Sequence, residues 1–330
     1  MITKARPGLL ASAAVIEPTV PASTRLAADP RPLVGYAMIW TAAILFGVNG
    51  SVSKVILDSG LSPLRLAQVR TTGALVGLAV LVLVLARHTL RVGARDLPFL
   101  IAFGVAGLAF VQLFYFLAIE RLPVGVALLI EYLAPLLIAL WARLVIREAV
   151  RRRIWAALAL AIAGLALVVQ VWNGLAFDGL GVAAALIDAV ALAIYVLLAE
   201  RGVAKRDPLS LSFFAFLFAA LFWAVVQPLW TFPVDAITRD VSLLGNFAGT
   251  DLPVWSLIGW VILLGTIAPF GLVVAALRHL PATTVAIVAM LEPVAAAIVA
   301  FLWLDESLAA IQLAGGGVVL LGILLAQTAR

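Results

Sequence analysis

The sequence predicts an all-α integral membrane protein with ten transmembrane helices, arranged as two inverted repeats of five. Three observations support this fold class. Of the 330 residues, 65% are hydrophobic and 12% are charged, against about 25% charged in soluble domains. The apolar residues gather in runs of roughly 20, the length that crosses a hydrocarbon core. In addition, two segments match each other at one constant offset along the chain.

Charged residues, proline or glycine bound the apolar runs and thereby predict the spans. The first five spans lie near residues 33–55, 63–86, 97–119, 122–144 and 154–172, and the second five near 179–199, 209–230, 254–277, 281–304 and 308–327. Short connections that begin with proline, such as RLPVG and HLPAT, indicate hairpins of adjacent helices. The long connection TFPVDAITRDVSLLGNFAGTDLP is expected outside the membrane, either as a cap or as a loose loop.

The distribution of Lys and Arg predicts the orientation of the chain. Seventeen of these cations fall on the side that holds the N-terminus and four on the other, with Arg70 inside a span. By the positive-inside rule, both termini are cytoplasmic. Residues 1–32, rich in proline, alanine and serine, are expected to form a disordered cytoplasmic tail.

Composition also argues against several functions. The chain has no cysteine, and its two histidines, His88 and His279, lie in short polar stretches between apolar runs. We therefore expect no metal site and no cofactor. The pI of about 10.1 reflects cations at the ends of apolar runs, which are topology signals rather than a nucleic-acid surface. The motifs HExxH, GxSxG and GxxxxGK[ST] are absent, so we expect no enzyme and no catalytic residue. A channel is also disfavoured, because the polar residues form no rings.

The internal repeat joins LAIERLPVGVALLIEYLAPLLIALWARLVIRE to AALRHLPATTVAIVAMLEPVAAAIVAFLWLDE without gaps. At an offset of 158 residues, the matched pairs include Leu122 with Leu280, Pro123 with Pro281, Pro135 with Pro293, Glu148 with Glu306 and Gly164 with Gly322. Five spans per half is an odd number, so the second half must enter the membrane the opposite way up. Inverted repeats with a site between the halves are typical of alternating-access transporters.

These segments also resemble a known family, the drug/metabolite transporters of the EamA type. FYFLAIERLPVGVALLIEYLAPLLIAL and ALRHLPATTVAIVAMLEPVAAAIVAFLWLDESLAAIQL resemble the branch of inner-membrane threonine/homoserine exporters. The resemblance covers residues 33–327 and implies two EamA-like repeats, here 33–172 and 173–330. It implies secondary export of small metabolites, often amino acids, across the inner (plasma) membrane without ATP. Nucleosides and aromatic amino acids remain alternative substrates, because substrates vary within the family.

Charged residues inside the spans are the candidates for a functional site. Three carboxylates, Glu131 (in EYLAP), Asp188 and Glu292, lie near span centres, and one cation, Arg70, lies in the second span. Ionised groups at that depth are costly and usually functional. Even if Arg70 pairs with one acid, two remain, so at least one is expected to carry a proton in some transport state. Glu131 is the first candidate for proton coupling; the alternative is a static Glu131–Arg70 pair.

Neutral polar side chains recur at helical spacing beside these charges. Gln112 and Tyr115 share one helix face, as do Asp188 with Tyr195 and Asn49 with Ser53. Together they suit the ammonium and carboxylate groups of an amino acid, although hydrogen bonding between helices is an equal alternative. Trp40 is a candidate to line the cavity, or else belongs to the aromatic belt.

Backbone-breaking residues complete the prediction. Pro135 and Pro293 leave backbone carbonyls unpaired and are candidate hinges. Gly73 and Gly77 form a GxxxG pattern that serves either packing within the chain or a homodimer, so monomer and homodimer both remain open. The partners expected from the sequence are a small-molecule substrate, the lipid bilayer and, as candidate coupling ions, protons.

Overall fold

The structure is a computed structural model that describes residues 31–85, 87–141, 144–145, 152–169, 178–203, 205–276, 279–280, 285, 288–289 and 291–327. The expected N-terminal tail lies outside the described residues as far as Pro30. Helix α1 begins at Pro32, where proline is tolerated because the first N–H groups of a helix have no partner within it.

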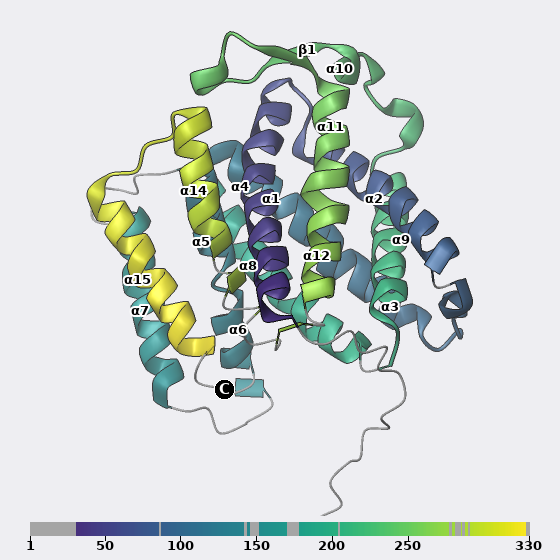
Figure 1. Cartoon of the computed structure of the whole chain (residues 1–330), viewed down its shortest axis with the longest axis horizontal. Coiled ribbons are helices and arrows are strands. Elements are labelled where there is room, and N and C mark those ends of the chain that lie inside the picture. Colours follow the sequence, from purple (N-terminus) through teal and green to yellow (C-terminus); the bar gives the residue numbers. More distant parts are fainter. Residues whose placement is uncertain are drawn as a thin grey trace, which may run out of the picture. The chain divides into compact units, whose positions relative to one another are not determined.

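Helices dominate the described chain (Figure 1). The first half contains α1 (Pro32–Asp58), α2 (Pro63–Leu85), η1 (Arg87–Leu90), α3 (Leu97–Ala102), η2 (Phe103–Ala109), α4 (Phe110–Arg121), α5 (Val124–Glu131), α6 (Ala134–Trp141) and α7 (Arg152–Val169). The second half contains α8 (Gly179–Val203), α9 (Pro208–Val226), η5 (Leu229–Thr231), α10 (Val234–Thr238), β1 (Asp240–Ser242), η6 (Gly245–Phe247), β2 (Asp251–Pro253), α11 (Val254–Ile262), η7 (Leu263–Ile267), α12 (Ala268–Ala276), α14 (Leu291–Leu304) and α15 (Ala310–Gln327).

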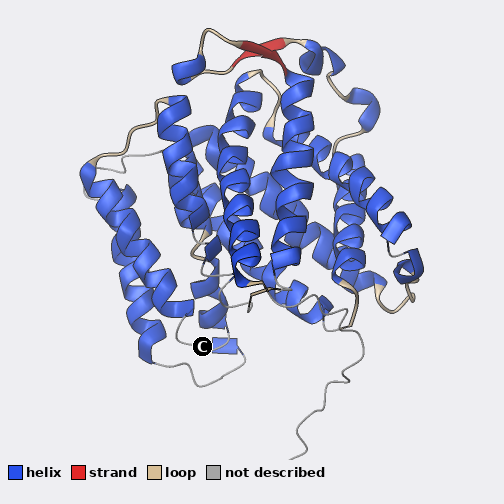
Figure 2. Ribbon diagram, viewed as in Figure 1, coloured by secondary structure: helices blue, strands red, loops and turns tan. Residues whose placement is uncertain are grey.

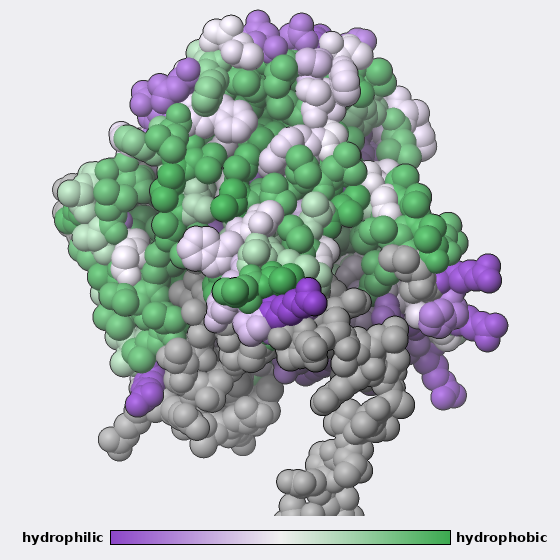
Figure 3. All heavy atoms as spheres, viewed as in Figure 1, coloured by the Kyte–Doolittle hydropathy of each residue, from purple (hydrophilic) through white to green (hydrophobic). Residues whose placement is uncertain are grey.

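Six stretches of the described chain are long and apolar enough to cross a membrane: Pro32–Asp58, Pro63–Val84, Leu97–Arg121, Gly179–Gly202, Pro208–Val226 and Val254–Val273. Four shorter apolar helices are Val124–Ile138, Trp155–Val168, Leu291–Leu304 and Ala310–Leu325. Each predicted span overlaps one of these ten stretches, while the count of ten complete crossings stays a prediction. The face drawn in Figure 3 is hydrophobic through its middle and hydrophilic toward its ends, as a membrane requires.

Two features differ from the sequence prediction. The fourth span, expected as one helix, is interrupted by a turn at Tyr132 and Leu133 between α5 and α6. Pro135 explains the break, because it has no N–H for the carbonyl of Glu131 four residues earlier. The fold is also not purely helical, because β1 and β2 pair antiparallel in the long connection (Figure 2).

The long connection is a cap rather than a loose loop. Its β-hairpin docks on the end of α14, where Trp303 Nε1 donates to the carbonyl of Leu243 at 2.7 Å and Asn246 Nδ2 donates to the carbonyl of Leu302 at 3.0 Å. The ring of Phe247 meets Trp303 edge to face at 6.1 Å. The hairpin therefore ties the segment before α11 to the far end of α14.

Helices α7 and α15 pack closely through glycine. A Cβ atom at Gly164 would lie 2.7 Å from the carbonyl oxygen of Gly315, and one at Gly322 would lie 2.8 Å from that of Ala157. Small residues allow such backbone contact in membranes, where dispersion rather than water expulsion drives helix association. The two helices form a pair that lies to one side of α14 in Figure 1.

A second junction ties α1 to α5 and to the end of α14. Lys54 Nζ donates to Glu306 Oε1 at 2.5 Å and to the carbonyl of Leu122 at 2.9 Å. The backbone N–H of Val124 donates to Glu306 Oε2 at 2.9 Å. The carboxylate thus caps the positive end of α5 while Lys54 binds the last carbonyl beyond α4. Both side chains are largely shielded, with 25% and 14% of their surface exposed.

Substitution of Gly164 by leucine should separate α7 from α15. Overpacking costs about 1 to 3 kcal/mol, so Gly164→Leu is expected to lower the thermal unfolding midpoint in detergent. Gly271→Leu is the matched control, because a Cβ atom at this helical glycine meets nothing within 4 Å. Equal midpoints for the two variants would contradict this account of the packing.

The Lys54–Glu306 junction predicts a non-additive double-mutant cycle. Lys54→Met leaves the Glu306 carboxylate without its charged partner and should cost about 1.5 to 3 kcal/mol, as for hydrogen bonds to charged groups. The double variant Lys54→Met with Glu306→Gln leaves no lone charge, so its loss of stability should be smaller than the sum of the two single losses. Thermal unfolding measures all three variants, and additive losses would argue that the two side chains do not interact.

Candidate functional site

The three intramembrane carboxylates come from separate helices and lie within electrostatic reach of one another. Glu131 ends α5, Asp188 lies inside α8 and Glu292 lies in the first turn of α14. The charge of Glu131 acts on Asp188, and that of Glu292 acts on Glu131. Because three like charges in a low dielectric repel one another, this cluster needs cations, protons or bound ligand groups to compensate it.

Arg70 of α2 supplies the cation of this cluster. Its guanidinium interacts electrostatically with Glu131 and Glu292, as well as with Tyr115 of α4. The side chain is 7% exposed, and that of Asp188 is 1% exposed. The structure therefore brings five of the predicted site residues to one region, in which Arg70, Tyr115 and Asp188 are buried and Glu131 and Glu292 are half-buried.

Arg70 is held by neutral partners. Its Nε donates to Thr266 Oγ1 at 2.9 Å and its Nη2 to the carbonyl of Gly265 at 3.4 Å, while its guanidinium carbon lies 5.6 Å from the ring centroid of Phe116. The ion pairs among the described residues are Lys54–Glu306, Arg121–Asp178 and Arg206–Asp96. A direct Arg70–Glu131 ion pair is not among these pairs, although the two side chains interact electrostatically.

The partners of Arg70 come from a π-helical turn. Turn η7 widens the helix between α11 and α12, and its Thr266 Oγ1 donates to the carbonyl of Val261 in α11 at 2.8 Å. Turns of this kind are frequent at functional sites because they present backbone groups that a regular helix would hide. Asn49 of α1 packs against Gly265 at the same place.

Tyr132 belongs to the cluster, although the sequence analysis did not select it. Its hydroxyl lies 2.8 Å from Glu292 Oε2 and 3.1 Å from the carbonyl of Ala289. The residue occupies the turn between α5 and α6 and links that turn to α14. Its place next to Glu131 in EYLAP was the available signal.

The predicted amide on α4 also joins this region. Thr71 Oγ1 of α2 lies 2.9 Å from Gln112 Oε1, and the hydroxyl of Tyr115 lies close to Gly50 of α1. Gln112 is 4% exposed, so the amide points to the interior rather than to lipid. Helices α1, α2 and α4 thus all present polar groups inward.

Two predicted residues lie apart from the cluster. The ring of Tyr195 stacks on that of Phe103, with centroids 5.0 Å apart, and contacts Gly107 of turn η2. This environment is that of a packing residue between α8 and η2. The side chain of Trp40 on α1 is 54% exposed. Its role in a cavity stays a prediction.

Several buried oxygen atoms in this region have no hydrogen-bond partner among the described residues. They include Asn49 Oδ1, Ser53 Oγ, Glu131 Oε2 and Asp188 Oδ1. Unsatisfied acceptors in a dry interior are costly, and they mark places where a ligand donor gains most. An ammonium group fits the carboxylates, and a carboxylate group fits Arg70. The described residues hold no cluster of three His, Asp or Glu side chains placed for a metal ion.

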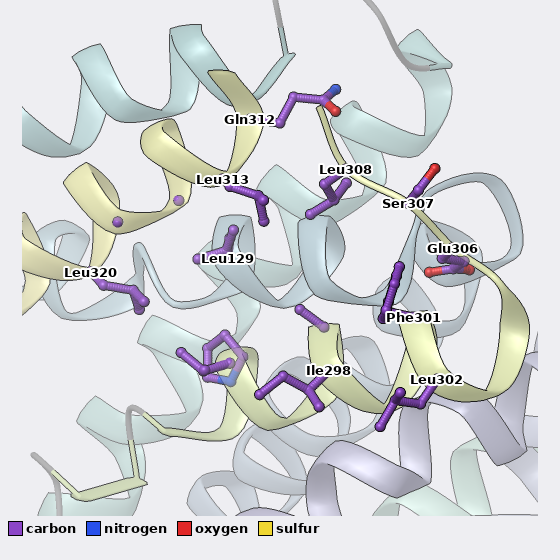
Figure 4. Close-up of a pocket in the computed structure, with 15 residues that line it drawn as sticks. Leu129, Ile298, Phe301, Leu302, Glu306, Ser307, Leu308, Gln312, Leu313 and Leu320 are labelled. Carbon is purple, nitrogen blue, oxygen red and sulfur yellow. The ribbon is translucent and has the colours of Figure 1, made fainter. Parts of the chain in front are cut away.

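A pocket of about 530 Å³ lies elsewhere, among α5, α14 and α15. Figure 4 shows leucine and phenylalanine side chains around it, with Glu306, Ser307 and Gln312 at its edge. Of the predicted site residues, only Pro293 lines this pocket. A polar metabolite would lose water there without gaining hydrogen bonds, so the buried polar cluster is the better candidate site.

Many apolar helices around a buried polar cluster define a multi-pass membrane protein, and comparison with known proteins gives its family. The model of the EamA-like transporter family matches residues 33–170 and again residues 179–328. The chain therefore belongs to the EamA-like transporter family.

The individual relatives share only about a quarter of their residues with this chain. The chain is 27% identical to the threonine/homoserine exporter RhtA of Escherichia coli (strain K12) over 277 residues, which cover 82% of each protein. It is 24% identical to an uncharacterized transporter of Archaeoglobus fulgidus over 268 residues, 80% of this chain and 88% of the relative. A crystal structure of a protein with 20% sequence identity shares the fold, with a TM-score of 0.56 over 88% of this chain and 96% of that one.

The partners of Arg70 predict how its variants behave. Arg70→Ala should lower the thermal unfolding midpoint, because Thr266 and the Gly265 carbonyl lose their buried donor. Arg70→Lys should restore little, since an ammonium group lacks the planar fork that reaches both acceptors. Adding Glu131→Gln to Arg70→Ala should not return the midpoint to the wild-type value. Full recovery in that double variant would instead indicate a direct Arg70–Glu131 pair.

Proposed function

We propose that this chain is a secondary active exporter of small polar metabolites, in particular amino acids such as threonine and homoserine. The observation that carries the proposal is the buried cluster, which offers carboxylates and unpaired acceptors to an ammonium group and Arg70 to a carboxylate. The names of the Escherichia coli and Salmonella typhimurium relatives point to the same substrates.

The proposed transport mechanism is alternating access between two inverted five-helix repeats. The two matches of the family model support the repeat, and so do close contacts at matched positions. Gly35 contacts His279 and Leu280, and Gly181 contacts Arg121 and Leu122, the same two positions minus 158. The two glycines are 146 residues apart, as are the starts of the two family matches. The π-helical turns η2 and η7 overlap at the offset of 158 residues.

Pro135 and Pro293 are the proposed hinges of this cycle. The break between α5 and α6 directly precedes Pro135, and Pro293 lies in the first turn of α14. A helix segment that lacks a backbone hydrogen bond bends at lower cost than a continuous one. These two segments meet at the polar cluster, so a bend there would change the access to it.

The proposal places the protein in the inner (plasma) membrane with both termini in the cytoplasm, as the distribution of Lys and Arg favours. It assigns no catalytic step to the chain, in keeping with relatives that are transporters. Gly73 and Gly77 contact Ile262 and Ile267 of the same chain, which favours packing within one subunit over a dimer through this motif.

Counterflow of labelled amino acids in proteoliposomes tests the function. Purified protein should exchange labelled threonine or homoserine against an internal pool of the same compound, and an imposed pH gradient should drive accumulation. A panel of other amino acids and nucleosides tests the alternative substrates. Absence of exchange with every amino acid, in a preparation shown to be folded, would overturn the proposed substrate class.

Glu131→Gln tests proton coupling in the same vesicles. A glutamine keeps the size of the side chain and one acceptor oxygen but cannot bind and release a proton. We expect counterflow to persist and accumulation driven by the pH gradient to be lost. Accumulation at the wild-type level would rule out Glu131 as the coupling residue.

A further inference from the structure

The hydroxyl of Tyr132 lies between two acceptors on one neighbouring segment. It is 2.8 Å from Glu292 Oε2 and 3.1 Å from the carbonyl oxygen of Ala289. A phenol carries one hydrogen, so it donates to only one of these acceptors at a time. Tyr132 belongs to the first half of the chain and both acceptors belong to the second, so the choice between them is made across the two halves.

The carbonyl of Ala289 needs a donor from outside its own helix. In an α-helix it would accept the N–H of residue 293, four positions later. That residue is Pro293, which has no N–H. An unpaired carbonyl inside a membrane is costly, and the Tyr132 hydroxyl stands within hydrogen-bonding distance of this one.

We propose that Tyr132 is a hydrogen-bond switch that transmits the protonation of Glu292 to the Ala289 carbonyl, which Pro293 leaves without its helical donor. When Glu292 is ionised, its carboxylate accepts the Tyr132 O–H in a charge-assisted hydrogen bond. When a proton from solvent binds Glu292, the new carboxyl O–H donates to the Tyr132 oxygen. The hydrogen of Tyr132 then turns to the Ala289 carbonyl. Tyrosine stays neutral in both states, and one proton is gained by the carboxyl group.

The neighbouring charges act on this switch from several helices. Arg70 of α2 and Tyr132 itself face Glu292, and Glu131 of α5 and Tyr115 of α4 also interact with it. Helix α8 contributes Asp188, which interacts electrostatically with Glu131 and so reaches Glu292 indirectly. Helix α1 also packs against α14, but its Lys54 is bound to Glu306 at the far end of that helix.

The consequence is that the hydrogen bond between Tyr132 and the Ala289 carbonyl forms only when Glu292 carries a proton. With Glu292 protonated, Tyr132 holds the Ala289 carbonyl, so the turn after α5 is fixed to the segment before Pro293. With Glu292 ionised, Tyr132 is held by the side chain and that carbonyl is released. Proton occupancy thereby decides whether Tyr132 binds the second half through the Glu292 side chain alone or through the Ala289 backbone as well. This role of Tyr132 rests on the proposed transport function and makes it a positioning residue.

Counterflow at equal pH on both sides of the membrane, repeated across a pH series, tests the switch. Wild-type exchange should vary with pH, whereas Tyr132→Phe and Glu292→Gln should each reduce that variation to the same extent, which leaves only the part due to other groups such as Glu131. The double variant should add nothing to either single change. Tyr36→Phe is the matched control, because it removes the hydroxyl of an exposed tyrosine on α1. A flat wild-type profile, or a wild-type profile in Tyr132→Phe, would overturn the proposal.

Infrared difference spectroscopy between two pH values gives a second readout that needs no substrate. The carboxyl band of Glu292 is identified by its loss in Glu292→Gln. In Tyr132→Phe that band should be displaced, because the phenol no longer hydrogen-bonds to the group, and in Tyr36→Phe it should stay in place. An undisplaced band in Tyr132→Phe would refute the switch. A displaced band without exchange of any amino acid would leave the switch standing and refute the proposed substrate.

Discussion

Two prolines impose the constraint on which the rest of the site depends. A membrane helix must satisfy its backbone polar groups from within the protein, because hydrocarbon offers no hydrogen bonds. Pro135 and Pro293 each withhold one N–H, which leaves the carbonyls of Glu131 and Ala289 without their helical donors. At Ala289 the hydroxyl of Tyr132 lies within hydrogen-bonding distance of this carbonyl. Glu131 and Tyr132 lie just before Pro135, and Glu292, which Tyr132 contacts, directly precedes Pro293.

Charged side chains are compensated in two ways in this molecule, by direct ion pairing and by electrostatic interaction at a distance. At the edge of the helix bundle, Lys54 and Glu306 form a direct ion pair, each with part of its surface exposed. In the interior, Arg70 instead binds a hydroxyl, a carbonyl and an aromatic face, and it acts on the carboxylates only through space. A tight interior ion pair would be hard to separate, because each ion would then be buried alone. Indirect compensation leaves the carboxylates accessible to a proton or a ligand.

Much of the fold followed from the sequence because long apolar runs have few alternatives to membrane helices. The β-hairpin did not follow, since it depends on contacts between distant segments. The break at Tyr132 has a local cause in Pro135, which the sequence analysis interpreted as a hinge within one continuous helix. In the site, Glu131, Asp188, Glu292 and Arg70 stood out because charges are rare inside apolar runs. Their partners did not, because spacing along a helix does not tell which neighbour a side chain meets. Tyr132 escaped notice for that reason, and Tyr195 was selected although it packs against Phe103.

The cap has an energetic consequence for the two ends of the helix bundle. At the end covered by the hairpin, α14 is held by the Trp303 and Asn246 hydrogen bonds, and the residue just beyond it, Glu306, is bound to Lys54. Separating α14 from its neighbours at that end would break these three interactions. A ligand that favours a form with α14 separated must bind that form more tightly than the present one. The difference in binding free energy must be at least the combined free energy of those three interactions.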